Sequence, residues 1–266
     1  MLRSRIEDQQ VKFNGIKHIV LSLFALAGII TSLSFASANH KHSLLTITKT
    51  NPGKDSSFVD EEKKKNSSVY FLYDSLRLDR QGLSRRAFEY AMQGLECLKQ
   101  SGDIDKDGVI SIVDFSLPSS SKRLFVIDLN SLKVLYCTYV AHGYNSGLEY
   151  ANQFSNKLQS NKSSLGFYKT LDTYMGGHGY SLKLEGLERG INDNANRRDI
   201  VIHGAAYVSE GLIRAQGYLG RSQGCPAIPE KLHRPIINKI KNGTCLFIYS
   251  LDKNYLRHSR ILNPTA

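Results

Sequence analysis

Short runs in the second half of the chain are rich in Val, Leu, Ile and Tyr, and glycines separate many of them, which is typical of β-strands. Apolar residues at helical spacing mark a segment at 230–242, where Ile236 and Ile240 share one face and Gly243 follows. We therefore predict a mainly β domain of the α+β class, with a helix near the C-terminus packed against the sheet. The predicted strands are 123–129, 132–140, 165–173, 180–184, 199–203 and 244–250.

Helical spacing also precedes this β-rich part. Leu72 and Leu76 repeat four residues apart, and a second apolar stripe begins after Ser84, a good N-cap residue, and ends at Gly102. We predict a helical pair at 67–102 that extends the domain and serves packing rather than chemistry.

The first 38 residues have the layout of a secretory signal. A basic start leads into an apolar run at 19–35, and Ala36-Ser37-Ala38 supplies a small-residue cleavage site. The alternative is an uncleaved membrane anchor, because the run nearly reaches the spanning minimum of about 17–20 residues. Both interpretations predict export to the periplasm or cell envelope, with a signal peptide or anchor at 1–38, a flexible polar linker at 39–66 and one domain at 67–266.

The positive net charge of the chain indicates what kind of partner it can bind. The formal net charge is +11, and an exported basic protein suits an anionic polymer or membrane surface, although dispersed lysines also serve solubility alone. No basic-aromatic motif predicts nucleic-acid binding. We expect membrane contact only through an N-terminal anchor.

Four cysteines occur, and none forms a CxxC or zinc-ribbon pair. No structural zinc site is therefore expected, and no cofactor is predicted. An oxidising compartment permits a disulfide among Cys97, Cys137 and Cys245, but spacing does not select one.

One constellation stands out as candidate chemistry. An apolar strand ends in His203-Gly204, and a glycine-bracketed turn, residues 220–226, then presents Cys225. Cysteine attacks as the thiolate, so an imidazole within hydrogen-bond reach activates it and later returns the proton to a leaving amine. From composition alone, an inert buried cysteine and a core histidine are the more common outcome.

The residues His203-Gly204, followed after an interval by Ser222-Gln223-Gly224-Cys225, resemble the signature of the murein L,D-transpeptidase catalytic domain (the YkuD-like family). The run at 163–168 resembles a strand of that family, and the similarity extends over about residues 110–250. The resemblance implies a β-sandwich or barrel fold and cysteine-dependent acyl transfer on peptidoglycan stem peptides, as an L,D-transpeptidase or L,D-carboxypeptidase.

The resemblance also assigns roles. Cys225 matches the nucleophile, His203 the base, and Gly204 the residue whose carbonyl orients the imidazole. Ser222 matches a hydroxyl that shapes the turn. Many members carry a second histidine where this chain has Gln223, and its absence here strengthens the assignment of the base to His203.

Two further expectations concern the groove. Pro226 has no N–H, so an oxyanion hole needs backbone donors at Gln223, Gly224 or Cys225. For substrate binding we expect Arg221, whose alternative is a turn-stabilising role, together with Tyr207, His142 and His178, although both histidines are also candidates for structural positions.

Three alternatives remain open from the sequence. A non-catalytic peptidoglycan-binding module would keep the fold without turnover. A zinc hydrolase would need His142, His178 and His203 as ligands, a spacing that matches no metal motif. The acidic run at 103–114 resembles an EF-hand calcium loop, but the second helix is missing, so we expect an acidic turn before the first strand.

Overall fold

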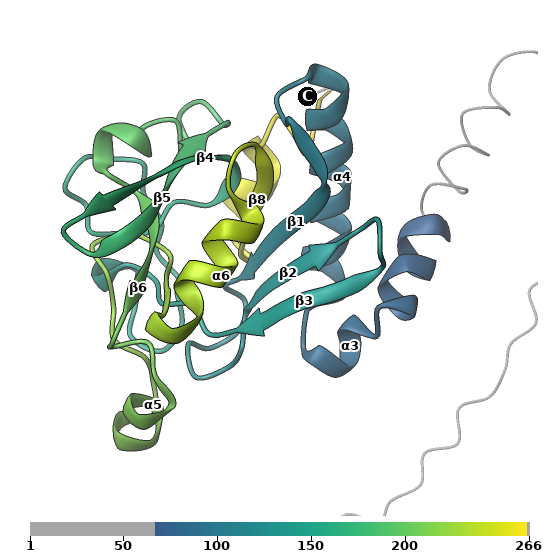
Figure 1. Cartoon of the computed structure of the whole chain (residues 1–266). Coiled ribbons are helices and arrows are strands. Elements are labelled where there is room, and N and C mark those ends of the chain that lie inside the picture. Colours follow the sequence, from purple (N-terminus) through teal and green to yellow (C-terminus); the bar gives the residue numbers. More distant parts are fainter. Residues whose placement is uncertain (1–66, 265–266) are drawn as a thin grey trace, which may run out of the picture. The chain divides into compact units, whose positions relative to one another are not determined.

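An eight-stranded sheet organises the described part of the chain, which in this computed structural model is residues 67–264. The strand order is β3-β2-β1-β8-β4-β5-β6-β7 (Figure 1). The prediction of a mainly β, α+β domain is confirmed, and so is each of the six predicted strands. The strands are β1 (Lys106–Asp114), β2 (Leu124–Asp128), β3 (Lys133–Thr138), β4 (Gly166–Gly176), β5 (Gly179–Gly186), β6 (Val201–Ala205), β7 (Ala227–Pro229) and β8 (Thr244–Tyr249).

Strand β1 corrects the expectation of an acidic turn at 103–114. Its second half is buried and pairs with both β2 and β8, so it lies inside the sheet. Its carboxylates are engaged separately rather than with one another. Asp107 forms an ion pair with Lys99 and Asp105 with Lys169, both at 2.9 Å, while Asp103 accepts from Ser101 and Asp114 from Ser84 and Ser116. The segment is therefore not a loop that could wrap calcium.

The predicted helical pair precedes the sheet. Residues 67–75 are helical, a short turn α3 (Leu78–Gln81) follows, and α4 (Arg85–Ser101) begins at the predicted cap, where Ser84 Oγ accepts from Ala87 N–H. Helix α4 approaches the sheet closely because Gly94 has no side chain; a Cβ there would overlap the ring of Phe167. Within residues 67–264 no helix combines the length and apolar character needed to cross a membrane.

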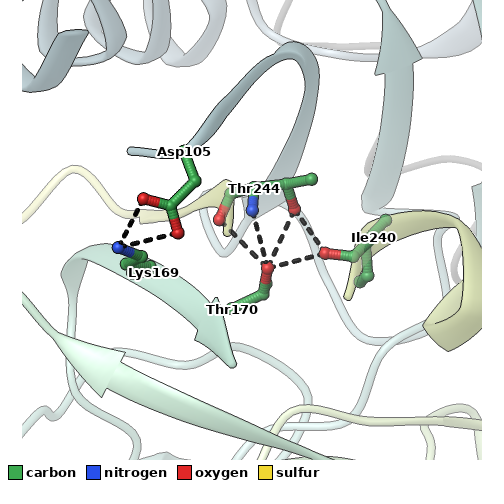
Figure 2. A network of polar contacts seen from close by, with 5 residues as sticks. All are labelled: Asp105, Lys169, Thr170, Ile240 and Thr244. Carbon is green, nitrogen blue, oxygen red and sulfur yellow. Dashed lines mark hydrogen bonds and ion pairs between the residues drawn. The ribbon is translucent and has the colours of Figure 1, made fainter. Parts of the chain in front are cut away.

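The C-terminal helix predicted at 230–242 is α6 (Glu230–Ile240), which Figure 1 shows in front of the strands while α4 lies behind them. A buried polar network fixes its end (Figure 2). Thr170 on β4 accepts from Thr244 N–H at 2.9 Å, and its hydroxyl lies 2.6 Å from the carbonyl oxygen of Ile240, the last residue of the helix. One hydroxyl thus joins β4, α6 and β8.

Two further helices, α5 (Glu210–Gln216) and α7 (Lys253–His258), were not predicted. Helix α7 is tied to the sheet through the buried carboxylate of Glu188. Its Oε1 accepts from Phe167 N–H at 2.9 Å and from the Tyr255 hydroxyl at 3.0 Å, and Ser259 donates to Oε2. Burial raises the pKa of Glu188, although these donors oppose the shift.

All four cysteines lie in the described region and are free thiols. The signal peptide or anchor at 1–38 and the linker at 39–66 fall outside the described residues.

Candidate active site

The pairing of β6 with β7 brings the predicted nucleophile and base together. The two strands are parallel, and His203 lies opposite Ala227. Cys225 precedes Ala227 by two residues, which places it beside Val201, and the Val201 N–H lies 3.5 Å from Cys225 Sγ. His203, in the middle of β6, and Cys225, just before β7, therefore both line one groove.

His203 is oriented by its own strand. The side chain is only 1% exposed, and Nδ1 lies 3.0 Å from the carbonyl oxygen of Gly204. A carbonyl only accepts, so Nδ1 carries the proton and a neutral ring keeps its lone pair on Nε2. Burial lowers the pKa of His203, the Gly204 carbonyl opposes this, and the nearby His178 and His233 lower it further. A neutral imidazole with a free Nε2 is the form that accepts a proton.

Cys225 is half-buried. Burial raises the pKa of its thiol, whereas the Val201 N–H and the positive charge of Arg198 lower it and Asp199 raises it. The Sγ atom also lies 3.5 Å from the carbonyl oxygen of Asp199, which accepts the S–H. Among the described residues, the hydrogen bonds of this sulfur are to Val201 and Asp199 and not to His203, and its raised pKa means that the group rests as the thiol.

Ser222 shapes the turn that carries the thiol. Its hydroxyl donates to the Cys225 carbonyl at 2.6 Å and accepts from Gly224 N–H at 3.0 Å. Gly224 has φ +124°, and a Cβ there would lie 2.9 Å from the Lys162 carbonyl oxygen, so only glycine fits. Because its N–H already donates to Ser222, Gly224 serves the turn, and the remaining candidate donors to an oxyanion are the N–H groups of Gln223 and Cys225.

The groove has a volume of about 990 Å³. It contains most of the residues expected there: Arg221, Ser222, Gln223, Tyr207 and His178 line it together with the Cys225–His203 pair. The ring of exposed His178 stacks on His203 with centroids 4.2 Å apart. Burial raises the pKa of Tyr207 to about 12, so its phenol is neutral beside the thiol.

His142 does not line this groove, so its predicted contact with substrate is wrong. It is fully buried, Nδ1 lies 2.8 Å from Arg123 Nη2 and Nε2 lies 3.2 Å from the Gly147 carbonyl oxygen. Since arginine only donates, Nδ1 accepts and Nε2–H donates. Burial and the charge of Arg123 lower the pKa of His142 to about 4. This histidine supports the groove from inside, because its carbonyl accepts from Ser222 N–H at 3.0 Å.

The burial of His142 also argues against the alternative zinc site, which would need this histidine as a ligand. Both ring nitrogens of His142 are engaged away from the groove, whereas His178 and His203 stack within it. Across residues 67–264 no three His, Cys, Asp or Glu side chains are grouped as metal ligands.

Arg221 shows features of both expected roles. It lines the groove, but Nη1 donates to the carbonyls of Tyr144 at 3.3 Å and Gly147 at 3.2 Å, and the guanidinium lies 4.2 Å from the ring centroid of Tyr144. The turn-stabilising role is therefore present in the structure, and contact with a substrate carboxylate stays a prediction.

Arg198 lines the groove as well, and the sequence did not single it out. It closes the 3₁₀ turn η2 (Asn196–Arg198) just before β6. An arginine directly preceding a strand that ends in the candidate base was the available signal, but its partners lie more than 30 residues away in sequence.

The sequence matches the L,D-transpeptidase catalytic domain family over residues 79–249, well over half of the chain. The chain belongs to this family. The resemblance of the His203 and Cys225 motifs to this family is thereby confirmed. No curated protein sequence matches significantly.

A search of solved structures finds similarity to an L,D-transpeptidase from Mycobacterium smegmatis, with 12% identity and a TM-score of 0.33. The matched region covers 54% of this chain and 59% of that one. The chain is also similar to the helical cell shape determining protein Pgp2 from Campylobacter jejuni, with 14% identity and a TM-score of 0.37. Here the matched region covers 61% of this chain and 57% of Pgp2. The chain thus spans less than two thirds of the length of these structures.

Proposed function

We propose that this protein is an exported cysteine acyltransferase that acts on peptidoglycan stem peptides, as an L,D-transpeptidase or an L,D-carboxypeptidase. One observation carries the proposal. His203 donates from Nδ1 to its neighbour's carbonyl and keeps Nε2 unprotonated in the groove that Cys225 also lines. General-base activation of a thiol needs such an unprotonated ring nitrogen, and substrate binding would have to bring it within hydrogen-bond reach of the sulfur.

The reaction follows from these protonation states. The Cys225 proton passes to His203 Nε2 as Sγ bonds to the carbonyl carbon of an L-configured residue in the donor stem. The C–N bond then breaks, and His203 returns the proton to the departing D-amino acid, which leaves a thioester on Cys225. An acceptor amine or water attacks this thioester while His203 takes its proton, and the thiol leaves as the product forms.

The developing oxyanion needs donors held in place before the reaction. The N–H groups of Gln223 and Cys225 are the candidates, because Gly224 N–H is bound to Ser222 and Pro226 has none. Each such donor typically contributes about 2.7–4 kcal/mol to transition-state stabilisation.

Membership of a cell-wall family supports export as well, since the substrate lies outside the cytoplasm. The predicted signal or anchor at 1–38 would place the domain there, and the basic charge of the chain suits the anionic wall.

The test is mass spectrometry of the full chain incubated with disaccharide-tetrapeptide muropeptides, and separately with a carbapenem. We expect loss of the terminal D-amino acid or cross-linked dimers, and a carbapenem adduct on Cys225. The Cys225→Ala variant should lose both. Cys137→Ala is the matched control, because Cys137 is another half-buried free thiol that lies on β3 and does not line the groove.

Activity that survives Cys225→Ala would refute the proposal. Muropeptide binding without turnover by the wild-type chain, unaffected by thiol alkylation, would instead identify a non-catalytic binding module.

A further inference from the structure

The guanidinium of Arg198 is held entirely by neutral oxygens. Nη1 donates to the Ser155 carbonyl at 2.7 Å and to the Ser164 hydroxyl. Nη2 donates to the Lys162 carbonyl at 2.5 Å and to the Ser160 hydroxyl at 3.2 Å. These bonds fix the position of the group without neutralising it.

The charge of Arg198 has no counter-ion. In the described range, 67–264, no carboxylate forms an ion pair with it, and the side chain is only half-exposed. Burial lowers the pKa of Arg198, and the fields of Cys225 and Tyr168 raise it. Half-burying a cation without a carboxylate is unfavourable, which suggests that the charge serves another group.

The guanidinium of Arg198 contacts the turn at residues 222–225, which carries the nucleophile. A Cβ atom on Gly224 would lie 3.2 Å from Arg198 Nη2, so the guanidinium packs directly against the residue before Cys225. Both Arg198 and Cys225 line the groove. Ser163, which sits between two of the clamped positions, also donates to the Gly224 carbonyl at 3.3 Å, so the segment held by Arg198 and the turn form one unit.

We propose that Arg198 is the positioning residue that stabilises the thiolate of Cys225 electrostatically, as an uncompensated cation fixed beneath the nucleophile turn. The inference deepens the proposed function and rests on Cys225 being the nucleophile. It explains how a thiol that burial disfavours as an anion can still give up its proton to His203.

The other titratable groups near the thiol do not supply this charge. Asp199 opposes it, because its carboxylate raises the pKa of Cys225. Tyr207 is neutral, with a pKa raised to about 12, and the lowered pKa of His203 leaves that ring uncharged at neutral pH. Arg221 lies at the groove wall with its guanidinium over Tyr144.

The experiment measures the pH dependence of iodoacetamide alkylation at Cys225 in the full chain, with peptide mass spectrometry to separate it from the other thiols. Two neutral variants, Arg198→Gln and Arg198→Met, guard against a single substitution that fails to fold. Arg198→Lys keeps the charge. Arg197→Met is the matched control, because Arg197 is the neighbouring groove arginine, exposed and without the clamp.

We expect the alkylation midpoint of both neutral variants to move to higher pH, with a rate at pH 7 on the order of tenfold lower and an unchanged plateau at high pH. Arg198→Lys and Arg197→Met should remain close to wild type. A midpoint that does not move in the neutral variants, or a loss in Arg198→Lys as large as in Arg198→Gln, would overturn the inference. Alkylation needs no peptidoglycan substrate. A failure of this inference can therefore be told apart from a failure of the proposed function, which the muropeptide assay tests.

Discussion

Ser222→Ala tests how much the nucleophile turn depends on a single hydroxyl. The side chain is 7% exposed, and its removal leaves both Gly224 N–H and the Cys225 carbonyl without their partner. A buried polar group without a partner costs about 1–3 kcal/mol. Because the turn borders an open groove that admits water, we expect the free energy of unfolding to fall by about 2 kcal/mol in total.

The assay combines thermal unfolding with turnover of muropeptides. For a domain of this size, about 2 kcal/mol corresponds to a Tm lower by roughly 4–8 °C. The released Gly224 N–H lets the turn relax, and a displaced nucleophile should lower kcat by on the order of 10–100-fold. Ser120→Ala is the matched control, since its hydroxyl makes only a long contact of 3.5 Å with Glu149 outside the groove.

The reasoning fails if Ser222→Ala melts with wild-type Tm and turns over substrate at the wild-type rate. A lower Tm with unchanged kcat would separate the two roles and show that the turn holds its shape without the hydroxyl.

Three further outcomes follow from buried polar groups. Thr170→Val should lower the free energy of unfolding by about 1–3 kcal/mol in urea, because the Thr244 N–H loses its acceptor. The kcat/KM profile should fall as pH drops through the lowered pKa of His203, so its acid limb lies below pH 6.5; an acid limb above that value would contradict a neutral base. The raised pKa of Glu188 means that the native state binds this proton more tightly than the unfolded chain, so this contribution to stability is greatest in acid and is lost as pH rises through the raised value. Glu188→Gln should flatten the dependence of the free energy of unfolding on pH, measured by melts taken across pH 4–8. An unaltered dependence would show that it comes from another group.

The local sequence pattern was enough to predict those strands and helix ends that nearby residues determine. Alternation and β-branched residues located β2 to β6 and β8, and Ser84 and Gly102 marked the ends of α4. Strand β1 was missed because three aspartates and Gly108 look like a turn. Its pairing with β8, more than 130 residues later in the chain, decides its conformation.

The candidate site likewise contains residues that the local sequence predicts and residues whose roles depend on distant contacts. The motif residues identified the His203 and Cys225 pair, and the parallel pairing of β6 and β7 brings them together. The burial of His142 depends on Arg123, and the role of Arg198 depends on carbonyls from a distant segment. Such contacts have no local signature, so a histidine beside a glycine looked like a groove residue when it was part of the interior.

The register of β6 with β7 has a consequence for variation of the chain. Because strand pairing rather than the length of the connection sets the spacing of His203 and Cys225, the short helix α5 within that connection can vary in length. That helix has no buried residue. Insertions or deletions within α5, whose residues do not line the groove, would leave the buried Val208 and Leu219 and the reacting atoms in place.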